Sequence, residues 1–206
     1  MNAISESAIR RMSDFTGQNI ANTAWSCATI EMTVAPLLSS LAAKASRMSL
    51  ELDPQSLANT AWAYASLECQ HWPLMESIAE ASLPSMGQWT ACELSSTAWA
   101  FARFGLRNVP LMKATAEPSS AQRQELTMLD IANTAWAFES LEVPAEGRFR
   151  SLVVARGLVD FVHDAVLDLN SHGVEMVHLA NAANLGGGAP FLKKPPLLTS
   201  FWSVGA

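Results

Sequence analysis

Residues 57–64 have the sequence LANTAWAY, and residues 131–138 have the closely similar sequence IANTAWAF. The centre of this motif, Thr-Ala-Trp, occurs four times in the chain. Its tryptophans are Trp25, Trp62, Trp99 and Trp136, so each lies 37 residues from the next. A constant period between 20 and 50 residues is typical of stacked structural repeats. The motif therefore predicts a repeat protein.

Two further residue types recur in the same register. Prolines stand at Pro36, Pro73 and Pro110, again 37 residues apart. Residue types that favour a helix N-cap occupy one position in all four units: Thr16, Asp53, Thr90 and Thr127. A proline at the first helical position is favourable because its missing N–H would have no partner there. Each unit is therefore predicted to contain two helices.

We name these helices A and B. The pattern predicts helix A over residues 17–31, 54–68, 91–104 and 128–142. It predicts helix B over residues 36–48, 73–83, 110–117 and 147–167. Apolar residues recur at intervals of three and four rather than two, which excludes a sheet. The predicted fold is all-α, an α-solenoid of helix-pair repeats with a 37-residue period.

Helix A carries a wide apolar arc, as expected for a helix that touches its own partner and both neighbouring repeats. Its alanines allow close helix approach. The four tryptophans of the motif lie at the edge of the arc, and we interpret them as the structural core of the repeats, with each indole N–H reaching a polar partner. The opposite arc is polar. Its middle row is Asn22, Asn59, Ser96 and Asn133, and its outer row is Asn19, Ser56, Glu93 and Asp130.

The register changes towards both ends of the chain. Residues 1–15 form a lead-in, and the repeats span residues 16–145. Pro118 is expected to shorten the third helix B. Residues 146–189 are predicted to hold an extended fourth helix B and a degenerate fifth repeat around the sequence LANAAN at 179–184. Residues 190–206 form an irregular tail, which we expect to be loose rather than to cap the stack.

Composition narrows the classes of function. The chain has 206 residues, of which 50% are hydrophobic and 16% charged, and its formal net charge is −6. This excludes a strongly basic nucleic-acid binder but leaves room for a neutral polar groove. Three cysteines without a C-x-x-C spacing argue against disulfides and zinc, so we interpret them as apolar fillers. The chain contains no uninterrupted stretch of about 20 apolar residues, so no membrane-spanning helix is expected. The chain is also a candidate fragment of a longer protein.

The phrase Leu/Ile-Ala-Asn-Thr-Ala-Trp-Ala-Phe/Tyr resembles the first helix of heptatricopeptide and octotricopeptide repeats. These repeats occur in organellar RNA-binding proteins, often before a RAP domain, and are related to the repeats of FAST-kinase-like mitochondrial proteins. The resemblance covers residues 16–145, and no RAP domain is visible. It implies a right-handed α-solenoid that binds single-stranded RNA in a mitochondrion or plastid and acts in RNA processing, stability or translation.

Under that hypothesis the polar rows read bases, because helical repeats use amide and hydroxyl groups on base edges. The middle row supplies amides, and the outer row varies from unit to unit. Arg103, with Arg107, Lys113 and Arg123, would contact phosphates. The alternative for the middle row is hydrogen bonding between neighbouring helices. For the threonines of the motif the alternative is a bond back to the preceding turn.

Catalysis is not predicted. His71, His163, His172 and His178 have no metal or triad spacing, and Gly186–Gly188 lack the Lys-Ser/Thr of a phosphate loop. We therefore expect no enzyme activity, cofactor, metal, membrane or DNA partner. The competing hypothesis is a protein-interaction solenoid that binds a peptide or a helix without nucleic acid. The acidic net charge favours that alternative.

Overall fold

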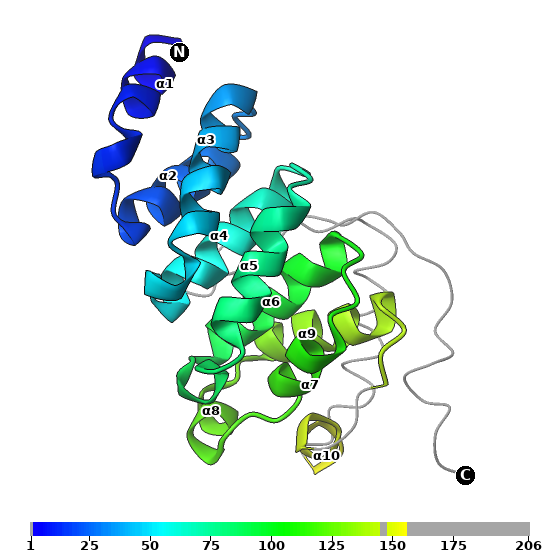
Figure 1. The fold of residues 1–206 in the computed structure, drawn as a ribbon. Coiled ribbons are helices and arrows are strands. Elements are labelled where there is room, and N and C mark those ends of the chain that lie inside the picture. Colours follow the sequence, from blue (N-terminus) through cyan, green and yellow to red (C-terminus); the bar gives the residue numbers. More distant parts are fainter. Residues whose placement is uncertain (1, 145–147, 156–206) are drawn as a thin grey trace. The chain divides into compact units, whose positions relative to one another are not determined.

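The computed structural model describes residues 2–144 and 148–155, and these residues form helices and turns without a strand. The chain divides into two compact units, Met1–Trp89 and Thr90–Ala206 (Figure 1). The all-α prediction is confirmed for the described part of the chain.

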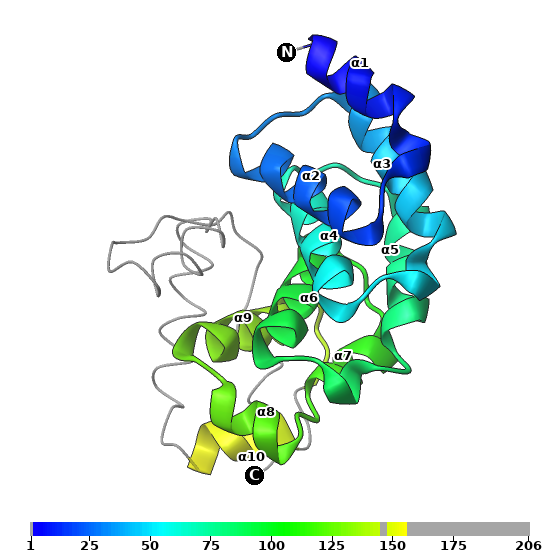
Figure 2. The ribbon, with the colours of Figure 1, turned by 90° about the vertical axis from the view of Figure 1, so that its left-hand side faces the viewer.

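The first unit contains five α-helices and three single-turn 3-10 helices among its described residues. They are α1 (Asn2–Arg10), η1 (Met12–Asp14), α2 (Gly17–Thr29), α3 (Ala35–Arg47), η2 (Ser49–Glu51), α4 (Pro54–Ser66), α5 (Trp72–Ser82) and η3 (Met86–Gln88). Within this unit α2 packs along α4, α3 packs along α5, and each of α2 and α4 also packs against the helix that follows it. Figure 2 shows α2 and α4 in one layer and α3 and α5 in the other.

The second unit contains α6 (Ala91–Arg103), α7 (Val109–Thr115), α8 (Ser120–Glu125), α9 (Met128–Ser140) and α10 (Arg148–Ala155). Helix α6 packs along α9 and also contacts α7 and α8. The third helix B, α7, ends at Thr115, so the shortening expected from Pro118 is confirmed. Helix α8 was not predicted. Of the fourth helix B, predicted over 147–167, only Arg148–Ala155 lies in the described part, and the degenerate fifth repeat and the tail lie outside it.

The four A helices are α2, α4, α6 and α9. Each has 13 residues, and they begin at residues 17, 54, 91 and 128, which agrees with the predicted starts. Their N-termini are capped as predicted. The side chains of Thr16, Asp53, Thr90 and Thr127 each accept a hydrogen bond from the backbone N–H three residues later. An apolar residue precedes each cap, at Phe15, Leu52, Trp89 and Leu126, where a hydrophobic staple to the first turn is expected.

The A helices end one or two residues earlier than predicted because each closes with a left-handed residue. The positive φ angles are at Glu31, Glu68, Gly105 and Glu142, again 37 residues apart. The next residue donates its backbone N–H to a carbonyl five residues back, as Met32 does to Cys27 at 2.8 Å. This is a Schellman ending, in which the left-handed residue is usually glycine. Three of the four positions hold glutamate instead.

The core of each unit lies between the A and B helices. Of the four tryptophans predicted to form the repeat core, Trp62, Trp99 and Trp136 are buried and Trp25 is half-buried. Small residues of helix A such as Ala24 and Ala61 are fully buried and allow close helix contact. In the first unit the hydroxyl of Tyr64 in α4 donates to the carbonyl of Leu38 in α3. Burial raises the pKa of Tyr64, so this hydroxyl remains a donor.

The lead-in predicted over 1–15 is itself organised like part of a repeat. Helix α1 ends at Arg10, 37 residues before the end of α3 at Arg47, and η1 precedes η2 by the same interval. Helix α1 packs against α3, as α3 packs against α5. Thus α1 and η1 occupy the place of a helix B and its following turn.

Candidate functional site

The middle polar row lies on the A helices, at the same repeat position in each. Asn22 is exposed, Asn59 and Ser96 are half-buried, and Asn133 is buried. Within the units these residues form two pairs on neighbouring helices, one on α2 and α4 and the other on α6 and α9. The amide oxygen of Asn133 has no hydrogen-bond partner among the described residues. The proposed base-contact group is thus accessible mainly in the first unit.

The outer row has a local function at the start of helix A. The side-chain amide oxygen of Asn19 accepts from the backbone N–H of Thr16 at 3.0 Å. The Glu93 carboxylate accepts from the backbone N–H of Thr90 in the same way at 2.7 Å. Asp130 does it for Thr127 at 2.9 Å. These are reciprocal capping boxes, which satisfy backbone N–H groups that the helix leaves free. Ser56 of α4 is buried, and its backbone N–H donates to the N-cap Asp53 at 2.7 Å, but α4 has the forward cap without the reciprocal side-chain bond. Three of the four residue types of this row, Asn19, Glu93 and Asp130, are therefore explained by capping, without RNA.

Asp130 makes a second contact that joins two helices. Its Oδ2 caps α9, whereas its Oδ1 accepts from the Ser95 hydroxyl of α6 at 2.6 Å. Ser95 is 1% exposed and Asp130 is 5% exposed. The buried pair shows which face of a helix A meets the helix A before it.

The candidate phosphate ligands are held by other groups, with one exception. The Arg103 guanidinium lies 5.8 Å from the centroid of the Trp99 ring, within the range of a cation–π contact. Arg107 donates to the carbonyl of Glu142, and Arg123 donates to the carbonyl of Pro118. Lys113 is exposed.

The threonines of the motif behave differently from unit to unit. The Thr23 hydroxyl donates to the Asn19 carbonyl at 2.7 Å, which is the predicted bond to the preceding turn. The same prediction is wrong for Thr60 and Thr97, whose buried hydroxyls have no hydrogen-bond partner among the described residues.

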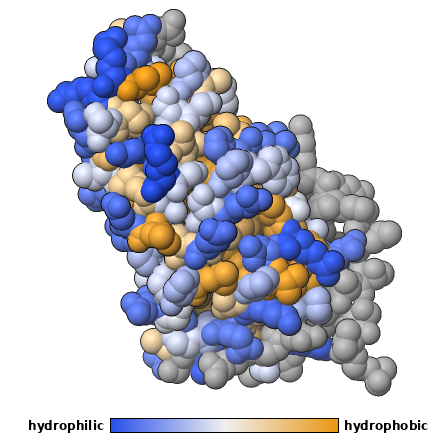
Figure 3. Space-filling view, viewed as in Figure 1, coloured by the Kyte–Doolittle hydropathy of each residue, from blue (hydrophilic) through white to orange (hydrophobic). Residues whose placement is uncertain are grey.

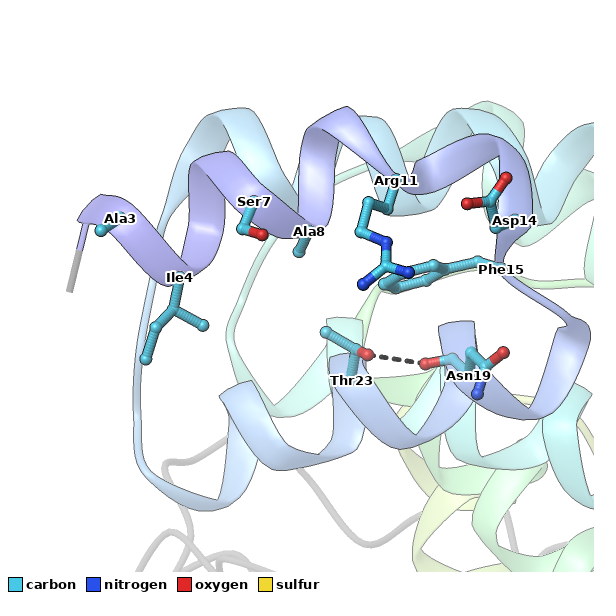
Figure 4. Close-up of a pocket in the computed structure, with 9 residues that line it drawn as sticks. All are labelled: Ala3, Ile4, Ser7, Ala8, Arg11, Asp14, Phe15, Asn19 and Thr23. Carbon is cyan, nitrogen blue, oxygen red and sulfur yellow. Dashed lines mark hydrogen bonds between the residues drawn. The ribbon is translucent and has the colours of Figure 1, made fainter.

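A hollow that the sequence did not predict opens between α1 and α2. In Figure 4, Ile4, Ala8, Arg11 and Phe15 lie across from Asn19 and Thr23 of α2. One cavity of about 630 Å³ is lined by these residues, and an adjoining cavity of about 450 Å³ continues along α2 to Ser26 and Ile30. The signal that could have indicated it is the recurrence of helix B register in residues 2–14.

Possible metal ligands do not cluster in the described part of the chain. Among its residues no group of three or more His, Cys, Asp or Glu side chains could hold a metal ion. Burial raises the pKa values of the thiols of Cys27, Cys69 and Cys92, and the charge of Asp130 adds to the effect at Cys92. The interpretation as apolar fillers fits Cys27, which is buried, whereas Cys69 is half-buried and Cys92 is exposed, so it is wrong for Cys92. No helix in residues 2–144 or 148–155 has the length and apolar character needed to span a membrane.

The described surface mixes polar and apolar groups. In the space-filling view of Figure 3, hydrophilic side chains interrupt hydrophobic ones along the visible face.

Comparison with known families identifies the chain. The family model of RNA-editing substrate-binding complex 6 protein matches residues 1–109, more than half of the 206 residues. The chain belongs to this family. The matched segment contains α1 to α6 and therefore both Asn22 and Asn59. No curated protein matches the chain. The family is helical and RNA-related, and in these two respects it agrees with the resemblance noted in the sequence. The match is not specifically to RAP or heptatricopeptide repeats.

Proposed function

We propose that the chain is an RNA-binding helical-repeat protein that acts within an RNA-processing complex of an organelle, a mitochondrion or plastid. The observation that carries the proposal is membership of a family named for an RNA-editing substrate-binding complex. In this proposal the 37-residue units stack as an α-solenoid of the heptatricopeptide type. The RNA is single-stranded, because its bases must be free to meet the repeats.

The accessible amides of the first unit are the proposed base contacts. Asn22 and Asn59 lie on neighbouring helices, and neither is needed for a cap. An amide can donate and accept at once, which suits a base edge. Asn19, Glu93 and Asp130 are assigned to capping in this proposal, and Asn133 is too buried to reach a base.

The test is binding of the full chain to a randomised single-stranded RNA pool at low and physiological salt. The double variant Asn22→Ala/Asn59→Ala should weaken binding of the enriched sequence roughly tenfold or more, or about 1.4 kcal/mol. Gln18→Ala/Gln55→Ala is the matched control, because both glutamines are exposed on the same two helices. Equal binding by both double variants would contradict base contact by this row. Absence of binding at low salt would reject RNA recognition by the chain alone.

The competing function is a protein-interaction scaffold. Its support is the net charge of −6 and the engagement of Arg107 and Arg123 with backbone carbonyls. Counterion release makes phosphate binding strongly salt-dependent, so the slope of affinity against salt separates the two functions. An RNA-binding chain should lose affinity steeply as salt rises, whereas a neutral protein contact should change little.

A further inference from the structure

The pairing of α6 and α9 shows how one helix A receives the helix A before it. The hydroxyl of Ser95 in α6 meets Oδ1 of Asp130 in α9 at 2.6 Å, while the other carboxylate oxygen caps α9. The third residue of a helix A therefore lies on the side that meets the preceding helix A, which we call the upstream face. The fifth residue of a helix A lies on the side that meets the following helix A, which we call the downstream face.

The same faces meet between α2 and α4 in the first unit. Ser56 is the counterpart of Asp130 and is 4% exposed, and Ala21 is the counterpart of Ser95 and is 2% exposed. Helix α2 packs along α4. On the upstream face of α4, Thr60 and Ala63 are fully buried. This face of a helix A is therefore shaped to receive another helix.

The upstream face of α2 is uncovered among the described residues. Asn19 and Ser26 are exposed where their counterparts Ser56 and Ala63 are buried, and Ile30 at its end is 65% exposed. The adjoining cavity of about 450 Å³ follows these residues, and Ile4 of α1, 78% exposed, stands at its rim. Ile4 and Ile30 thus place apolar surface at the rim of a cavity that runs along the uncovered face of α2.

We propose that this face of α2 is a docking site for an α-helix supplied by a partner protein. The chemistry of the partner helix follows from Asn19. Its amide oxygen accepts from the backbone N–H and the hydroxyl of Thr16, whereas no described residue accepts from its amide nitrogen. The partner helix presents a hydrogen-bond acceptor, such as a serine hydroxyl, to that nitrogen, as Ser95 faces Asp130. Small side chains flank the acceptor and allow the close approach seen between α2 and α4.

A second copy of this chain is a poor source of the partner helix. The residues that mark the downstream face are already buried in all four A helices. They are Ala21, Ala24 and Ala28; Ala58, Ala61 and Ala65; Ser95, Ala98 and Ala102; and Ala132, Ala135 and Glu139. A second copy would have to open its own packing to offer one of these faces. A separate helical protein carries no such cost.

The first experiment extends the full chain by one helix. Residues 90–111, which contain α6 and Ser95, are joined directly before Met1. This restores the repeat register, because Met1 then stands in the place of Met112. The melting temperature of the extended chain should exceed that of the original chain by about 4 °C or more.

Single substitutions on α2 locate the gain. Ser26→Arg lies on an exposed residue, so it leaves the original chain folded, but its counterpart Ala63 has no free space once a helix packs there. The variant should abolish the gain in the extended chain. Gln18→Arg adds the same side chain outside the face, since Gln18 and its counterpart Gln55 are both exposed, and it should preserve the gain. No gain, or a gain that survives Ser26→Arg, overturns the proposal.

The second experiment uses a free partner helix. A fluorescently labelled peptide of residues 90–108 is titrated with the full chain, and Ser26→Arg should weaken its binding roughly tenfold or more. Sedimentation of the original chain tests the second copy as occupant. If the chain dimerises and Ser26→Arg makes it monomeric, a second copy covers the face and the partner-helix proposal is wrong. Neither experiment contains RNA, so its outcome is independent of the RNA-binding proposal.

Discussion

Helices α2 and α9 contain the identical hexapeptide IANTAW, at residues 20–25 and 131–136, in very different surroundings. In α2, Asn22 is exposed and Trp25 is half-buried. In α9, Asn133 is 1% exposed and Trp136 is 3% exposed. The motif thus specifies the helix and its apolar arc, whereas the neighbouring helix decides whether its polar side is accessible.

This difference separates two functions that one sequence motif was expected to serve. An asparagine of the middle row can contact a base only where helix packing leaves its amide accessible, as it does for Asn22 and in part for Asn59. A buried asparagine at the same position in α9 can serve only the packing of its own unit. Substitutions at equivalent positions of the two helices therefore measure the contribution of the neighbour directly.

The largest difference is expected at the tryptophans. Trp136→Ala should lower the free energy of unfolding by about 3–5 kcal/mol, because it removes a buried aromatic side chain and leaves a cavity. Trp25→Ala should cost only about 1–2 kcal/mol, because part of that ring already contacts water and the site is open to solvent. Urea unfolding followed by far-ultraviolet circular dichroism measures both. Equal losses would mean that Trp25 is as well packed as Trp136 in solution.

The third residue of each helix gives a smaller difference. Asp130→Ala removes a capping contact and leaves the buried Ser95 hydroxyl without its carboxylate, so a loss of about 2–4 kcal/mol is expected. Asn19→Ala removes only the capping contact of an exposed helix end, and about 1 kcal/mol is expected.

Ser95→Ala is the control for this pair of variants. It keeps the α9 cap and removes the inter-helix bond together with the weaker bond from the same hydroxyl to the Cys92 carbonyl, so its cost should lie between the two. If Asp130→Ala cost no more than Asn19→Ala, the Ser95–Asp130 bond would contribute nothing to stability, and the assignment of the upstream face would lose its main support.

The local structure could be predicted from the sequence because its causes are local. The starts of all four A helices followed from one N-cap position, and the early end of α7 followed from Pro118. The ends were less accurate, since a glutamate gives no sign that its backbone will be left-handed. The lead-in carries no tryptophan motif, so only weaker signals such as the 37-residue spacing of Arg10 and Arg47 indicate the register of α1.

The candidate site was harder to predict because accessibility depends on contacts between helices. The helical wheel put Asn22 and Asn133 on one polar arc, and it could not show that a packed unit buries the second of them. Variation in the outer row indicated base reading, yet Asn19, Glu93 and Asp130 all satisfy the same capping geometry with different side chains. Three residue types with one local function cannot be distinguished from three specificities by sequence alone.

The smallest effect is expected at the helix ends, and there α2 and α9 should agree. Glu31 and Glu142 have φ angles of 52° and 51°, and both are exposed. Glycine enters this region without the steric cost of a Cβ, so Glu31→Gly and Glu142→Gly should each raise the free energy of unfolding by about 0.5–1 kcal/mol. The reverse change, Gly105→Ala, should cost a similar amount, because a Cβ is disfavoured at φ 67°. No clash adds to this cost, since the new Cβ would meet nothing within 4 Å. Thermal unfolding of the three variants measures these changes. A gain in α2 without one in α9 would show that helix ending, like the exposure of the asparagines, depends on the neighbouring helix rather than on the chain itself.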